Sequence, residues 1–250
     1  MILDLPLAHI EVLAPYFRGK AFRGTGTSDN SIRLSTMQLI DEHFSKVGMP
    51  NHPCRPSLQL ALERLNNEPA LIVETGSAAY GTKSTLLFDA YVNRNGGFVH
   101  SVDIRCEPLL TLLANVSPST ILHCNDSVEF LSKFSWGEAR GRILVYLDSY
   151  DLDVSNPIPS ASHCFQEFLL CLPQLAATGG ILLIDDTPVD FPSWFKVQGS
   201  SDQNRFDHCK NSLGFYPGKG GAVVEYIRAT KIATIVHHGY QVLCDFSKSQ

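Results

Sequence analysis

Three aspartates stand at positions where metal chemistry is possible. Asp148 ends the apolar run 143–148, and Asp185 and Asp186 close the run 181–185. Such runs are typical of buried strands, and the carboxyl ends of neighbouring parallel strands meet at one sheet edge. Three carboxylates there repel one another, so we expect a cation or a shifted pKa, unless one acid caps a helix and the others face solvent. With no His or Cys nearby in sequence, oxygen ligands favour Mg²⁺ or Ca²⁺ over zinc.

A glycine-containing loop at 74–85 is the second candidate for ligand binding. Gly76 and Gly81 lie between a predicted strand and a predicted helix, where glycine lets a ligand approach the backbone and the helix start offers free N–H groups. The loop lacks the G-x-G-x-x-G pattern of NAD and FAD sites. It has the glycine spacing of a phosphate-binding P-loop, but a threonine intervenes before Lys83 and Ser84. A merely tight turn is the remaining alternative.

Acidic residues after the next two predicted strands help to decide between a nucleoside cofactor and a phosphate as the ligand of this loop. Asp103 ends the second apolar run, where a carboxylate can accept both hydrogen bonds of a ribose diol. A P-loop enzyme does not need that acid, so Asp103 favours a nucleoside cofactor, with a solvated strand-end acid as the alternative. Asp126 and Ser127 follow the third run. Asp126 or Asn125 can cap a helix, with Glu129 completing a capping box, or Asp126 and Ser127 can face an adenine edge; the two interpretations are compatible.

The elements that must position these residues alternate along the chain. Strands are predicted at 70–74, 98–103, 120–124, 143–148 and 181–185. Helices are predicted at 82–93, 107–115, 127–134 and 163–176. This alternation indicates an α/β fold, a Rossmann-like and mostly parallel sheet with helices on both faces. After a helix at 220–230, the runs 232–236 and 240–246 flank His237-His238-Gly239, which predicts a C-terminal antiparallel β-hairpin with the histidines exposed at its tip.

The length of 250 residues favours one decorated domain. Residues 1–67 are predicted to form an N-terminal helical cap, and residues 68–250 the main domain. Within the cap, one helix is expected to begin at Asn30 or Ser31 and a second at Pro56.

Residues 187–219 are predicted to be an insertion in the main domain. The segment is rich in aromatic residues, including Trp194, and shows no clear secondary structure. Long segments of this kind are usually functional. We expect it to cover a substrate together with the N-terminal helices, the alternative being a packed loop or a dimer contact.

Composition argues against several classes of protein. The net charge is −5 and no Lys/Arg cluster occurs, which disfavours a nucleic-acid partner. No apolar run approaches the roughly 18 residues of a membrane span, and the acidic N-terminus does not read as a signal peptide. The seven cysteines include no C-x-x-C pair and lie mostly in apolar runs. We therefore expect free thiols in a reduced, cytoplasmic protein.

Together these motifs resemble those of class I S-adenosylmethionine-dependent methyltransferases. The likeness lies in E-T-G…G-T-K-S-T, S-V-D, N-D-S-V-E-F-L, L-D-S-Y-D and G-G-I-L-L-I-D-D, and covers about residues 68–246. Within the class the chain looks most similar to metal-dependent small-molecule O-methyltransferases of the catechol type and of the macrolide or aminocoumarin sugar type. The segment G-A-V-V-E-Y-I-R-A-T before the hairpin resembles the sugar-modifying branch. The resemblance implies S-adenosyl-L-methionine as cofactor, Mg²⁺ as a second one, and a small-molecule hydroxyl as acceptor.

The same resemblance implies roles for individual residues. The cofactor contacts would be Glu74, Thr75, Gly76, Gly81, Ser84, Asp103, Asp126 and Ser127. Mg²⁺ would bind Asp148, Asp185 and Asp186. Asp148 is the favoured catalytic base, with Lys83 as the alternative. The chain departs from the catechol branch at Asp186, where that branch commonly has Asn, and its cofactor loop is one residue longer than usual.

Three other functions remain open on the sequence alone. They are a nucleotide-binding phosphotransferase using Gly76–Ser84, a non-catalytic Rossmann-like binding protein, and an N- or C-methyltransferase. The resemblance also raises the prospect of a homo-oligomer.

Overall fold

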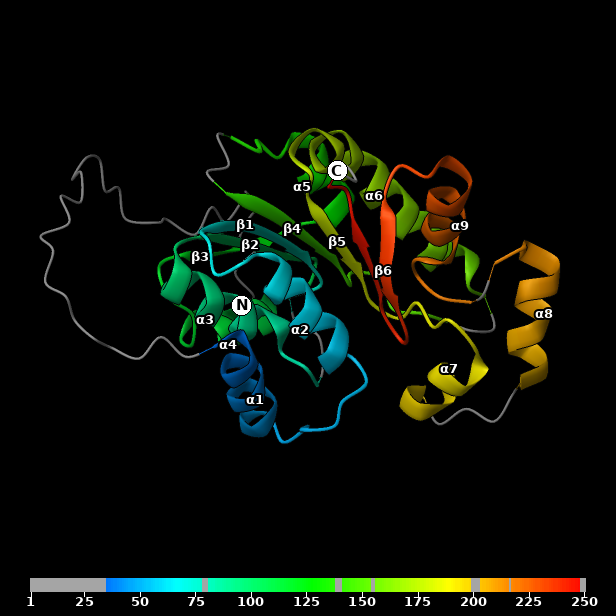
Figure 1. The fold of residues 1–250 in the computed structure, drawn as a ribbon, viewed down its shortest axis with the longest axis horizontal. Coiled ribbons are helices and arrows are strands. Elements are labelled where there is room, and N and C mark those ends of the chain that lie inside the picture. Colours follow the sequence, from blue (N-terminus) through cyan, green and yellow to red (C-terminus); the bar gives the residue numbers. More distant parts are fainter. Residues whose placement is uncertain are drawn as a thin grey trace, which may run out of the picture.

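A computed structural model gives the fold of the chain (Figure 1). It describes residues 35–77, 81–137, 141–153, 156–198, 203–215 and 217–247. The tip of the glycine-containing loop, residues 78–80, and the N-terminal residues through 34 lie outside the described residues.

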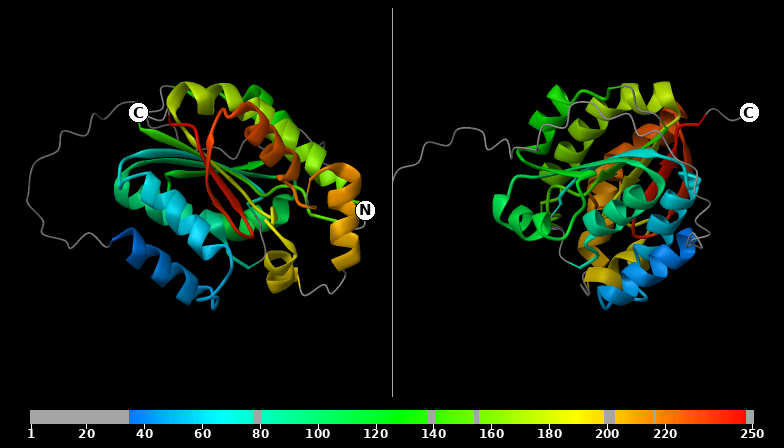
Figure 2. Two further views of the ribbon diagram at one scale, coloured as in Figure 1. Left: turned by 45° about the vertical axis from the view of Figure 1, so that its right-hand side comes forward. Right: turned by 90° about the vertical axis from the view of Figure 1, so that its left-hand side faces the viewer.

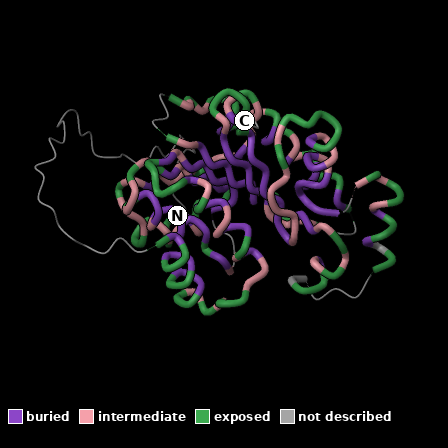
Figure 3. Tube along the Cα trace, in the orientation of Figure 1, coloured by how far each residue is buried: buried purple, intermediate pink, exposed green. Residues whose placement is uncertain are grey.

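Seven strands of the described chain form one sheet in the order β3-β2-β1-β4-β5-β7-β6. Their bounds are β1 Ala70–Thr75, β2 Gly97–Asp103, β3 Thr120–Cys124, β4 Arg142–Leu147, β5 Ile181–Ile184, β6 Thr234–His238 and β7 Val242–Asp245. Strands β1 to β5 pair in parallel, and β7 inserts antiparallel between β5 and β6. The predicted mostly parallel sheet with a closing antiparallel hairpin is confirmed. Figure 3 shows its central strands buried.

Helices cover both faces of the sheet, as predicted (Figure 2). Their bounds are α1 Thr36–Lys46, α2 Arg55–Arg64, α3 Ser84–Asn95, α4 Cys106–Leu113, α5 Ser127–Lys133, α6 Ile158–Thr178, α7 Phe191–Gln198, α8 Gln203–Leu213 and α9 Gly221–Thr230. Alternate residues of a strand face opposite layers. In β1, Ile72 packs with α1, α2 and α3, and the adjacent Val73 packs with α5, α6 and α9. The two apolar layers thereby fix the strand ends that carry the acids.

The first helix starts later than the sequence suggested. Ser35 adopts extended backbone angles, and its hydroxyl accepts a hydrogen bond from the Gln38 N–H at 3.2 Å. The Gln38 side chain accepts in turn from the Ser35 N–H at 2.7 Å. This reciprocal capping box begins α1 at Ser35, so the N-cap of this helix is Ser35 and not the expected Asn30 or Ser31.

Two predictions about the C-terminal third are wrong. His237 and His238 lie within β6, half-buried, because the hairpin turns at 239–241 and not at the histidines. The 187–219 insertion has regular structure, since it contains α7 and α8. Trp194 is 2% exposed and packs against Phe206, a ring pair whose centroids are 6.3 Å apart. Its indole is therefore part of the core.

The expectation of free thiols is wrong for one pair of cysteines. Cys106 and Cys124 form a disulfide with a Cα–Cα distance of 5.2 Å. Cys124 pairs with Asp103 in the parallel register of β2 and β3, and α4 begins at Cys106 just after that strand end. Sheet pairing thus joins residues that no local motif connects. The other five cysteines are buried thiols.

Among the described residues, no helix combines the length and the apolar character needed to cross a bilayer.

Candidate functional site

The predicted site residues gather at one edge of the sheet, where the parallel strands end. The register places Glu74 of β1 beside Ser101 of β2 and Tyr146 of β4. Leu147 of β4 pairs with Ile184 of β5. The residues that follow these strand ends therefore meet along one line, as the sequence predicted.

Glu74 anchors the glycine-containing loop from inside the protein. Its carboxylate is fully buried and accepts hydrogen bonds from Ser84 at 2.5 Å, from Thr85 at 2.6 Å and from Ser101. Burial raises the pKa of the Glu74 carboxyl above its ordinary value, and the hydroxyl donors oppose that shift. A P-loop would present its serine hydroxyl to Mg²⁺. Here the Ser84 hydroxyl donates to the Glu74 carboxylate instead. This contact disfavours the phosphotransferase alternative.

Gly76 brings the end of β1 against the end of β4. Its φ is +90°, and a Cβ there would lie 2.2 Å from the carbonyl oxygen of Asp148. The Asp148 N–H donates to the Thr75 carbonyl at 2.9 Å. Only glycine fits this approach, and the buried Gly76 lines the cavity described next.

Gly81 and Lys83 lie on the far side of the loop tip. Gly81 has φ +102°, and a Cβ added there would meet the Met49 side chain at 3.5 Å. Lys83 takes a left-handed backbone conformation at the start of α3, with its side chain exposed. Neither residue lines the cavity or joins the aspartate cluster.

A cavity of about 430 Å³ opens beside Gly76. It is lined by Gly76, Val102, Asp103, Ile104, Arg105, Asp126, Ser127, Ser149, Tyr150, Asp151 and His163. Four predicted cofactor residues are among these, namely Gly76, Asp103, Asp126 and Ser127.

Asp103 is held by its own loop. Its Oδ1 accepts from the Arg105 N–H at 2.8 Å and from the Arg105 Nε at 3.1 Å. The Asp103 side chain is 3% exposed, whereas that of Arg105 is 42% exposed. The carboxylate is thus fixed at the cavity wall by a partner two residues away.

Asp126 and Ser127 lie at the start of α5. Asp126 caps that helix, since its Oδ1 accepts from the Glu129 N–H at 2.9 Å, so this part of the capping interpretation is confirmed. The capping box is not formed, because the Asp126 N–H donates to the Asn125 side chain and the Glu129 carboxylate accepts from Lys133. The Ser127 hydroxyl lies 2.8 Å from the Nε2 of His163.

His163 and Glu167 of α6 were missed by the sequence analysis. Glu167 is 1% exposed, and its Oε1 accepts from Ser149 at 2.8 Å. A hydrogen bond to Glu167 raises the pKa of His163 above its ordinary value, against the opposing effect of burial. The sequence placed His163 at the first turn of its helix, whereas α6 begins at Ile158, so the side chain's inward direction was not apparent.

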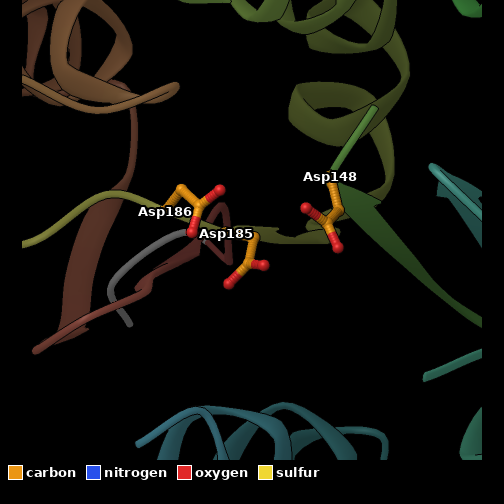
Figure 4. Close-up of side chains that lie close together, drawn as sticks. All are labelled: Asp148, Asp185 and Asp186. Atoms are coloured by element: carbon orange, nitrogen blue, oxygen red, sulfur yellow. The ribbon is translucent and has the colours of Figure 1, made fainter. Parts of the chain in front are cut away.

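Asp148, Asp185 and Asp186 converge as predicted (Figure 4). One carboxylate oxygen of each lies within 4.8 Å of the other two. The donor set of three hard oxygens fits Mg²⁺ or Ca²⁺. Burial raises the pKa of both Asp148 and Asp186, and the neighbouring charge of Asp185 adds to the shift in each case.

Lys219, which no sequence motif singled out, lies inside this cluster. Its Nζ is 2.5 Å from the Asp148 Oδ1 and 3.2 Å from the Asp186 Oδ2. The residue is 3% exposed. Burial lowers the pKa of the ammonium, but the carboxylate charges outweigh it and hold that pKa well above its ordinary value. The chain thus places an ammonium group of its own among the aspartates.

The hairpin turn supplies two further partners of the aspartates. Gln241 is fully buried and donates from Nε2 to the Asp185 Oδ1 at 2.6 Å. The Tyr240 hydroxyl donates to the Asp186 Oδ1. These contacts were not foreseen because the hairpin turn was predicted too early.

The surroundings of the cluster also correct one expectation. No His or Cys is near these aspartates in sequence, but the Cys54 Sγ lies 3.6 Å from the Asp185 Oδ1. His52 is close enough for Asp185 and Asp186 to oppose the lowering of its pKa by burial. The segment between α1 and α2 thus packs over the strand ends.

Comparison with solved structures identifies the fold. The chain superimposes on the MycE methyltransferase from the mycinamycin biosynthetic pathway, solved in complex with Mg and SAH and also with Mg, SAH and mycinamycin VI. The TM-scores are 0.53 and 0.54, the sequence identity is 14%, and each match covers 84% of this chain and 56% of MycE. This chain therefore has a class I methyltransferase fold and spans about half the length of MycE.

The O-methyltransferase NovP also matches over 85% of this chain and 98% of its own, at 11% identity and a TM-score of 0.49. No protein-family model and no curated protein sequence matches the chain.

Proposed function

We propose that this protein transfers the methyl group of S-adenosyl-L-methionine to a hydroxyl group of a small molecule, assisted by Mg²⁺. The observation that carries the proposal is the contact at Gly76, which lines the cavity that suits a nucleoside and packs against the main chain of Asp148, a member of the carboxylate cluster that suits a cation. A methyl donor and a metal-held acceptor need that adjacency. The fold likeness to MycE, whose structure holds Mg, SAH and mycinamycin VI, supports the same assignment.

The cavity residues fit the cofactor. Gly76 has no side chain, so a ligand can approach its backbone closely. Asp103 presents a fixed carboxylate for the ribose hydroxyls, and Asp126 with Ser127 lies at the wall assigned to adenine. Glu74 is fully bonded to hydroxyls, so we propose that it acts on the cofactor by fixing the loop.

The aspartate cluster fits the acceptor side of the reaction. Methyl transfer is an in-line displacement in which the protein mainly aligns the reacting atoms. A divalent ion held by Asp148, Asp185 and Asp186 would lower the pKa of an acceptor hydroxyl. Asp148 lies nearest the Gly76 contact, and we propose it as base or metal ligand. Lys83, the alternative base, is exposed and does not line the cavity.

Two measurements test this function. Calorimetry with SAH and with ATP should show binding of SAH alone; ATP binding without SAH binding would overturn the proposal. A methyl-transfer screen of catechols, sugars and small phenols, run with and without EDTA, should reveal an acceptor whose methylation falls when the ion is chelated. Turnover that chelation leaves intact would remove Mg²⁺ from the mechanism while keeping the transferase.

A further inference from the structure

The backbone holds Lys219 against the end of β5. The Lys219 N–H donates to the Asp186 carbonyl at 3.0 Å, and the Gly220 N–H donates to the Thr187 hydroxyl at 3.0 Å. A Cβ at Gly218 would lie 2.6 Å from the Asp186 carbonyl oxygen. Gly218 and Gly220, on either side of Lys219, have no room for a side chain. Their close packing against the end of β5 places Lys219 beside the aspartates.

The ammonium uses the oxygens that a metal would need. It contacts Asp148 at 2.5 Å and Asp186 at 3.2 Å. Asp185, the third member, is occupied by Gln241. All three carboxylates lie within a space small enough for one ion to touch them together. A divalent ion at that place would meet a buried positive charge at contact distance.

We propose that the Lys219 ammonium and a divalent cation occupy the Asp148–Asp185–Asp186 cluster in alternation. Lys219 acts as a tethered cation that neutralises the cluster when no ion is bound, and an ion binds only by displacing it. The inference deepens the metal-assisted function proposed above and rests on it. Lys219 is then the residue that sets how tightly the site holds metal.

An alternative arrangement is that the ion and Lys219 lie side by side in the cluster, since three carboxylates, one ammonium and one divalent ion sum to zero charge. Loss of the nearby positive charge would strengthen cation binding in that arrangement as well. The two arrangements differ in what happens to the Lys219 amine. Only competition moves it away from the carboxylates, so Mg²⁺ should make Lys219 open to reductive methylation, and an amine that stays protected when Mg²⁺ is bound overturns the proposal.

The test compares Lys219→Met with the wild-type protein and with Lys133→Met, a control at a surface lysine whose side chain is 70% exposed. Free Mn²⁺ is measured by electron paramagnetic resonance during titration, and Mg²⁺ binding by calorimetry. We expect Lys219→Met to bind both ions at least about tenfold more tightly, because a competing charge is gone. The control should leave the affinity unchanged. Equal or weaker binding by Lys219→Met overturns the proposal.

Thermal unfolding gives a second readout. In EDTA, Lys219→Met should have a lower Tm than wild type, because three closely spaced carboxylates lose their counter-charge. Mg²⁺ should restore that Tm by mass action and raise the wild-type Tm less. A variant whose Tm ignores Mg²⁺ contradicts the proposal.

A second variant covers the case in which Lys219→Met does not fold. Asp186→Asn removes one negative charge, so Asp186→Asn/Lys219→Met has less repulsion to relieve. We expect the double variant to bind Mn²⁺ more tightly than Asp186→Asn alone; equal or weaker binding overturns the proposal. SAH affinity is measured on the same wild-type samples, so failure of the methyltransferase assignment appears there, separately from the metal data.

Discussion

The candidate site lies along one edge of the sheet, and the two ends of this edge hold their acidic residues in different ways. At the end of β2, Asp103 is paired with Arg105, two residues away and 42% exposed. At the ends of β4 and β5, Asp148 and Asp186 are paired with Lys219, which is buried and comes from beyond α8. The first arrangement is local and open to a cavity, whereas the second is long-range and closed. The difference suits the proposed function, in which the pocket exchanges a cofactor and the cluster holds one cation at a time.

Gly76 is where the two ends touch, so its loss should have the largest effect. Gly76→Ala places a Cβ against the Asp148 carbonyl in a backbone conformation that disfavours side chains. We expect a loss of about 3 kcal/mol or more in the free energy of unfolding. Gly48→Ala is the matched control, since Gly48 also has positive φ but no atom within 4 Å of an added Cβ, and it should cost only about 1 kcal/mol. Urea unfolding measures both; similar losses would show that the two ends are not in tight contact.

The open end has a covalent tie that the closed end lacks. The Cys106–Cys124 disulfide joins two residues with a sequence separation of 18. It ties the loop that carries Asp103 to the loop that carries Asp126. Reduction should lower the free energy of unfolding by about 3 kcal/mol and weaken SAH binding, with the Mg²⁺ response unaffected. Cys106→Ser/Cys124→Ser should behave like the reduced protein and ignore dithiothreitol. Unfolding curves with and without reductant check this, and a reductant-insensitive wild type would contradict it.

Asp103 pairs with a residue of its own loop, so we expect its substitution to affect ligand binding more than folding. Asp103→Asn removes the charge that we assign to the ribose, so SAH affinity should fall about ten- to hundredfold, or about 1.5–3 kcal/mol. Asp41→Asn, at an acid of α1 paired with Arg55, should leave SAH affinity unchanged. Calorimetry measures both. Full SAH affinity in Asp103→Asn would remove this residue from the cofactor site.

The smallest expected effect is a pH dependence at the cavity wall. Glu167 raises the pKa of His163 in the folded protein. A raised pKa contributes stability that is fully present below the unfolded value of about 6.5 and is lost as the pH rises through the folded value. His163→Gln should therefore cost more at pH 5.5 than at pH 8.5, by less than about 1 kcal/mol. His208→Gln, at an exposed position of α8, is the control, and an equal cost at both pH values would contradict the assignment.

The same contrast explains what the sequence could predict. The convergence of Asp148, Asp185 and Asp186 follows from strand order alone, because parallel strands end at one edge. The Asp126 cap depends on residues three apart, so its pattern is local. Lys219 and Gln241 belong to segments whose placement depends on packing, and no periodicity marks them.

Sequence patterns failed where two segments meet only through the sheet. Cys106 and Cys124 are joined because β2 and β3 are neighbours in register. Trp194 belongs to the aromatic segment that we expect to cover a substrate, and its burial against Phe206 shows that its indole packs in the core. Aromatic content alone cannot distinguish a core contact from a ligand contact.

The position of β7 links the aspartate cluster to the protection of a sheet edge. This strand inserts between β5 and β6 although it is the last of the described strands along the chain. Without it, β5 would have an open edge, and Asp185 and Asp186 would lack the Gln241 and Tyr240 partners that belong to the same hairpin. An open apolar edge is prone to pair with other chains. The same hairpin therefore protects β5 against aggregation and completes the surroundings of the aspartates.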